Sequence, residues 1–166
     1  MAHTAYHIGR EALRLLLVRR GITFLRTKTR KGSPDPERDA PAGIGRDPLG
    51  LKSVSSATDV NIVMGCDYYA ERFHPGGLAE LGEERMAALI LADIVDGVAS
   101  TGVRAGVIGE IGLGWPPSHS EVMALRAAVR TQLASGLALV IHPGRDPKAP
   151  FECVDIVTRA GGDVSR

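Results

Sequence analysis

Apolar residues follow two alternating patterns from about residue 47 onward: short continuous runs, and longer stretches at helical spacing. A short apolar run that ends in glycine or polar residues is typical of a parallel strand buried on both faces. Such runs predict three strands, near residues 61–66, 105–111 and 137–142.

Apolar residues at helical spacing fill the stretches after these runs and predict helices over residues 83–99, 118–134 and 150–160. Ser118, followed three residues later by Glu121, is a capping-box pattern and marks the start of the second helix. Gly136 and Gly161 lie just past two helix ends, where glycine is common. Repeated β/α units of this kind predict an α/β fold with a parallel sheet.

The first part of the chain differs in composition from the rest. Residues 1–32 hold eight Arg or Lys against one acid, whereas residues 33–166 hold twelve bases and eighteen acids. A short amphipathic helix is predicted over about residues 8–19, and the Pro, Asp and Gly of residues 32–45 predict a linker. The basic helix suits an organellar transit peptide, a membrane-surface helix or an ordinary surface helix. We therefore predict two parts, a basic segment over residues 1–41 and a domain over residues 42–166.

Composition narrows the class of protein. A chain of 166 residues with 44% hydrophobic and 23% charged residues is long enough for one domain with a sizeable core. Its net charge of +1 argues against nucleic-acid binding, and no apolar run approaches the ~20 residues of a membrane span. Two cysteines without a CxxC spacing suit reduced thiols. We expect a cytoplasmic protein with no nucleic-acid or membrane partner.

Each predicted strand ends in polar residues. Glu110 lies near the end of the second run and His142 ends the third. The carboxyl ends of parallel strands converge at one edge of a sheet, so Glu110 and His142 could face one ion. A carboxylate and an imidazole suit Zn²⁺ and related metals. The structural alternatives are a carboxylate held by backbone amides and a strand-end histidine with an ordinary hydrogen bond.

Two further residues invite a chemical role, and a structural role is expected for both. His74 lies beyond the end of the first predicted strand, so we expect it to support a loop instead of binding a metal. Cys66 has no legible His or Asn partner for nucleophilic catalysis, so we expect it to pack in the core.

Four motifs in order resemble the phosphotriesterase family over residues 42–166: GIGRDPLGL, MGCDYYAERFHP, TGVRAGVIGEIGLGWPPSHSE and VIHPGRDPKAPFE. The resemblance is strongest to the phosphotriesterase-related branch, which has glutamate where many relatives have a carbamylated lysine. It implies a (β/α)₈ barrel of the amidohydrolase type with two divalent metals, usually zinc. Glu110 would bridge the metals, His142 would bind one of them, and Tyr69 would line the substrate pocket.

The resemblance implies a metal-dependent hydrolase acting on a phosphotriester, a lactone or another ester of a small molecule. A water shared by the two metals would be acidified and would attack phosphorus or a carbonyl carbon. The alternative is a non-catalytic remnant or interaction module of the same family.

Several parts of the family pattern have no counterpart in this sequence: the first-strand His-x-His pair, the sixth-strand histidine and the last-strand aspartate. His3 and His7 are four residues apart, which suits one face of a helix and not the two-residue step of a strand. A typical barrel needs ~250 residues. We therefore expect a partial barrel, from a truncated or altered gene, with impaired hydrolysis and self-association through open strand edges.

Overall fold

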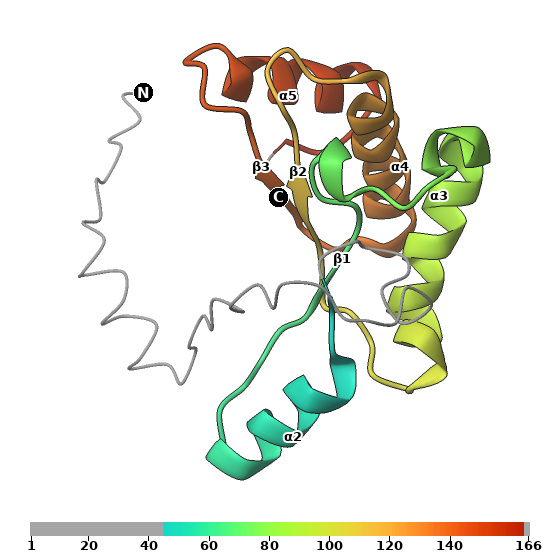
Figure 1. The fold of residues 1–166 in the computed structure, drawn as a ribbon, viewed down its shortest axis with the longest axis vertical. Coiled ribbons are helices and arrows are strands. Elements are labelled where there is room, and N and C mark those ends of the chain that lie inside the picture. The colour runs from blue at the N-terminus through green and yellow to red at the C-terminus, as the bar shows by residue number, and fades with distance from the viewer. Residues whose placement is uncertain (1–44, 165–166) are drawn as a thin grey trace.

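The computed structural model describes residues 45–164, which form three consecutive β/α units behind a first helix (Figure 1). The elements are α2 (Pro48–Thr58), β1 (Gly65–Cys66), η1 (Glu71–Phe73), α3 (Leu78–Val95), η2 (Val98–Ser100), β2 (Val107–Gly112), α4 (His119–Ser135), β3 (Leu139–His142) and α5 (Ala149–Arg159). The strands pair in parallel in the order β1-β2-β3. The predicted α/β class and parallel sheet are confirmed. The helix predicted over residues 8–19 and nearly all of the predicted linker lie outside the described residues.

Strand β1 is much shorter than predicted. The ladder covers only Gly65–Cys66, because β2 begins at Val107, directly opposite Gly65. Before this point the Gly106 N–H still donates to the Met64 carbonyl at 2.9 Å. Of the earlier residues in the predicted strand, Asn61 forms an isolated β-bridge and residues 62–64 are not part of a strand.

Helix α3 covers most of the helix predicted over residues 83–99 but ends before the predicted C-terminal end. Gly82 has non-helical backbone angles (φ 73°, ψ 160°), so a short turn from Leu78 precedes a main run that begins after Gly82, close to the predicted start. The helix ends at Val95 instead of residue 99. The residues after it form the separate 3₁₀ turn η2.

Helix α4 begins where its cap predicts. The Ser118 hydroxyl oxygen accepts from the Glu121 N–H at 3.3 Å, and the Glu121 carboxylate accepts from the Ser118 N–H at 2.9 Å. These two bonds are the predicted capping box. Gly136 ends the helix in the left-handed conformation (φ 72°), which glycine adopts without a side-chain clash.

Helix α2 was not predicted, although its start carries a signal. Asp47 caps it by accepting from the Gly50 N–H at 2.8 Å, and Pro48 occupies the first turn, where its missing N–H costs nothing. Arg46, just before the cap, donates to the Gly65 carbonyl at 3.0 Å and pairs with Asp93 at 2.7 Å. Arg46 thus ties the start of α2 to β1 and α3.

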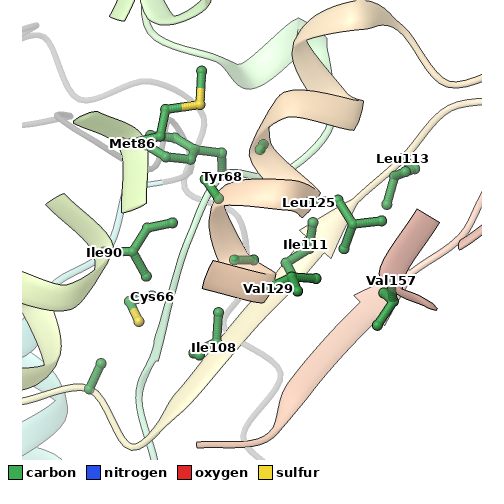
Figure 2. Packing of buried hydrophobic residues seen from close by; sticks show 14 of the residues in the cluster. Cys66, Tyr68, Met86, Ile90, Ile108, Ile111, Leu113, Leu125, Val129 and Val157 are labelled. Atoms are coloured by element: carbon green, nitrogen blue, oxygen red, sulfur yellow. The ribbon is translucent and has the colours of Figure 1, made fainter. Parts of the chain in front are cut away.

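The core lies between the sheet and the helices on one of its faces. Helices α3 and α4 pack against each other and against the strands, with α5 beside α4 (Figure 1). Ile108 and Ile111 of β2 are fully buried with Leu125 and Val129 of α4 (Figure 2). Residues three apart would face opposite sides of a regular strand. The pairing of β2 with β3 shifts between Gly109 and Ile111, and this bulge lets both isoleucines reach the core.

Apolar side chains remain exposed beside the sheet edge at β3. Val140 is 44% exposed, and Phe151 and Val154 of α5 are 76% and 54% exposed. A groove of about 150 Å³ is lined by Leu139, Ile141, Val154, Val157, Asp163 and Val164. Within the described residues β3 is an edge strand, and an apolar strand edge favours pairing with another chain. None of the helices described in residues 45–164 has the length and apolar character needed to cross a membrane.

We expect the 166-residue chain to self-associate through the edge at β3. Sedimentation velocity should show an average mass that rises with protein concentration. Val140→Lys places a charge on the edge strand and should shift the chain toward the monomer. Val54→Lys, at a 42% exposed position on α2, is the matched control and should leave the association unchanged. A compact monomer at every concentration would contradict this expectation.

Candidate functional site

Glu110 and His142 meet at the carboxyl ends of β2 and β3. Nδ1 of His142 lies 2.7 Å from Oε1 of Glu110. The bulge in β2 leaves Glu110 without a partner across the ladder, while His142 pairs with Gly112. The two side chains are 52% and 53% exposed, on the face of the sheet that the helices do not cover. The structure thus brings together the two residues predicted as metal ligands.

Tyr69 is the third predicted site residue and lies beside this pair, in the loop after β1. Its ring centroid is 5.7 Å from that of His142, with an edge-to-face angle of 80°. The ring can lie over the end of β2 because Gly112 has no side chain. A Cβ at Gly112 would come within 2.8 Å of Cδ2 of Tyr69 and 2.6 Å of the Ala70 nitrogen.

The donor groups at this site are too few for a complete metal centre. In the described part of the chain, no group of three or more His, Cys, Asp or Glu side chains could hold a metal ion. A catalytic zinc takes about three protein ligands. Glu110 and His142 supply one carboxylate and one imidazole, so they fit part of a zinc site but do not form a whole one.

His74 and Cys66 have the structural roles that the sequence predicts. Nε2 of His74 donates to the Tyr69 carbonyl at 2.6 Å, and Nδ1 lies 3.1 Å from Oγ of Ser120, so one ring nitrogen contacts the loop after β1 and the other contacts α4. Cys66 is 1% exposed. Burial, together with the nearby charge of Asp67, raises the pKa of the Cys66 thiol to about 12, so it is not a reactive nucleophile near neutral pH.

Glu121 has a larger role than the helix cap that the sequence indicates. Its Oε1 accepts from the Glu71 N–H at 3.0 Å, and its Oε2 accepts from the N–H groups of Gly114 and Ser118, both at 2.9 Å. Glu71 belongs to the loop after β1 and Gly114 to the loop after β2. The Glu121 side chain therefore links the loop after β1 to the loop after β2 by hydrogen bonds, beside the candidate site.

Burial of Glu121 alone would raise the pKa of its carboxyl group. The N–H donors of Glu71, Ser118 and Gly114 stabilise the carboxylate by more, so its pKa lies below the ordinary value. The capping box predicts only the bond with Ser118. The contacts with the two loops join residues that no local pattern connects, so sequence reasoning missed them.

A sequence model of the Phosphotriesterase family matches residues 29–166. The phosphotriesterase-related protein of Nematostella vectensis is 40% identical over 124 residues, which make up 75% of this chain and 35% of that protein. The N-acetyltaurine hydrolase of Homo sapiens is 35% identical over 124 residues, 75% of this chain and 36% of that protein. The chain thus spans about a third of the length of these relatives.

Solved structures show the same fold. A resiniferatoxin-binding protein from Rhodobacter sphaeroides matches with a TM-score of 0.69 and 36% identity, over 74% of this chain and 34% of that one. A phosphotriesterase homology protein from Escherichia coli, with phosphate in its active site, matches with a TM-score of 0.72 and 24% identity, over 76% of this chain and 43% of that one. These neighbours are (β/α)₈ barrels, so the three units described above correspond to part of such a barrel, as the family resemblance implies.

We expect Glu121→Gln to lower the free energy of unfolding by about 2 kcal/mol at pH 7, because hydrogen bonds to a charged group are lost. The folded-state pKa of Glu121 lies below its unfolded value. This stabilisation is therefore present above the unfolded pKa of about 4.3 and is lost as the pH falls through the folded pKa. Urea denaturation of both proteins should show the difference shrinking below about pH 5.

Glu84→Gln, at an exposed position of α3, is the matched control. It should change stability by less than about 0.5 kcal/mol. A difference between Glu121→Gln and the unsubstituted chain that stays constant down to low pH would contradict the assigned role of the carboxylate.

Proposed function

Because this chain belongs to the phosphotriesterase family, we propose that it contributes Glu110 and His142 as ligands to the divalent-metal centre of a metal-dependent hydrolase, with zinc as the expected ion. One observation carries this proposal. The two side chains lie 2.7 Å apart at the carboxyl ends of neighbouring parallel strands, on the open face of the sheet. A carboxylate can bridge two cations, and an imidazole binds one.

Each of the three residues has a separate role in this proposal. Glu110 is the bridging ligand and His142 is a ligand of a single ion. Tyr69 lines the substrate side of the site, and its position edge-on to the His142 ring supports that role. The remaining ligands would have to come from outside residues 45–164, since the described donors do not make a complete centre.

The proposed substrate is a small molecule with a hydrolysable bond. The sequence favours phosphotriesters, lactones and other esters. Relatives named as N-acetyltaurine hydrolases add an amide bond to the compounds worth testing, and a Deinococcus radiodurans neighbour is a lactonase, at 28% identity and a TM-score of 0.67. Because no group of three or more metal-binding side chains is found in residues 45–164, we propose that hydrolysis by the 166-residue chain is impaired.

A non-catalytic module of the same family is the second candidate function. The lack of a third metal-binding side chain near Glu110 and His142, among the residues that the structure describes, favours it. In this case the two residues would form only the hydrogen bond seen between them.

A cytoplasmic location is part of the proposal. Cys66 and Cys153 are both free and buried in separate parts of the fold, which suits a reducing compartment.

We expect the 166-residue chain to bind zinc weakly and to hydrolyse paraoxon-like triesters, lactones and N-acetyltaurine poorly or not at all. Two metals that share one bridging carboxylate need about five protein groups, and residues 45–164 bring together only two, Glu110 and His142. Calorimetric titration should show that Glu110→Gln and His142→Ala each lower the zinc affinity by about tenfold or more.

The matched controls are Glu152→Gln and His119→Ala, which change exposed residues of the same types elsewhere on the surface. Both should leave the zinc affinity unchanged. Zinc binding that none of the four substitutions affects would overturn the ligand assignment and favour the non-catalytic module. Tight stoichiometric zinc with robust turnover, abolished by either site substitution, would instead show that the chain is not impaired.

A further inference from the structure

A network of side chains lies beside the candidate site and joins the loop after β1 to the first turn of α4. This network, the loop clamp, consists of His74, Ser120 and Glu121. We infer that the loop clamp is a positioning device that holds the Tyr69 ring edge-on against His142. Its importance for hydrolysis rests on the proposed function, whereas its geometry can be tested without any metal or substrate.

The first contact of the loop clamp acts directly on the backbone of Tyr69. Nε2 of His74 lies 2.6 Å from the Tyr69 carbonyl oxygen. A carbonyl oxygen can only accept, so Nε2 of His74 carries a proton and donates it in this contact. This bond closes the loop between residues 69 and 74 and fixes the direction of the Tyr69 peptide group.

The second set of contacts anchors this loop to α4. The Ser120 hydroxyl donates to Oε1 of Glu71 at 3.0 Å, and its oxygen lies 3.1 Å from Nδ1 of His74. Oε1 of Glu121 accepts from the Glu71 N–H at 3.0 Å. Ser120 and Glu121 are 7% and 4% exposed, so water competes little for these bonds. The loop is therefore held through both a side chain and the main chain of Glu71.

The remaining contacts limit where the Tyr69 ring can lie. Gly112 forms the floor beneath it, where a Cβ would come 3.0 Å from Cε2 of the ring. Phe73 packs on it with ring centroids 5.5 Å apart, and the edge-to-face contact with His142 has centroids 5.7 Å apart. With the backbone fixed, these contacts restrict where the ring can lie. In the proposed site, that position sets the wall of the substrate pocket beside His142.

The experiment compares His74→Leu with His74→Gln in the metal-free 166-residue chain, by NMR. Unsubstituted protein should show cross peaks between the ring protons of Tyr69 and His142. His74→Leu keeps the bulk but loses the donor, and it should lose these cross peaks. The amide of His74→Gln can still donate to the Tyr69 carbonyl, so this variant should keep them. If His74→Leu does not fold, Ser120→Ala is a smaller change that can replace it. This variant should weaken the cross peaks between Tyr69 and His142.

Gln132→Leu is the control for a loss of global stability that leaves the contacts of the loop clamp in place. Gln132 is 3% exposed and exchanges two hydrogen bonds with the Asp163 backbone at the other end of α4. This variant should lose stability but keep the cross peaks. If folded His74→Leu keeps the cross peaks between Tyr69 and His142, the inference is wrong. It is also wrong if Gln132→Leu loses these cross peaks to the same extent as His74→Leu. Zinc titration of the Glu110 and His142 variants tests the proposed function separately, so either idea can fail alone.

Discussion

Three backbone N–H groups from two loops and a helix start converge on the buried carboxylate of Glu121. A buried charge is costly unless it is fully hydrogen-bonded, so the carboxylate favours only arrangements that keep all three donors in place. Helix α4 is fixed in turn, because its Leu125 and Val129 pack on β2. Helix, strand and both loops therefore form one unit, and the geometry around Tyr69 and His142 depends on it.

Local signals account for the parts of the fold that could be predicted from the sequence. The α/β class follows from alternating apolar patterns, and the start of α4 follows from Ser118 and Glu121, which are close in the chain. Tertiary context decides the rest. Strand β1 is short because its pairing with β2 begins at Gly65, which no pattern in residues 61–64 reveals. Asp47 and Pro48 mark the start of α2 locally, but apolar periodicity alone does not reveal this helix.

The candidate site divides in the same way. Glu110 and His142 could be paired from the sequence because parallel strands place their carboxyl ends together. The parts played by His74 and Glu121 could not, because their partners lie in other loops and are chosen by packing. Whether the pair binds metal stays a prediction, since the described residues offer an imidazole and a carboxylate without a third donor.

The bulge at Glu110 has a consequence for how this strand can evolve. Ile108 and Ile111 are three residues apart, and they share a face because the bulge places one extra residue between them. Deletion of one residue between them would leave them two apart, still on the same face, but it would remove the bulge and the unpaired position that Glu110 occupies. Burial of the two isoleucines therefore does not by itself require the bulge, and what the extra residue provides is a place for an acidic side chain at the end of the strand.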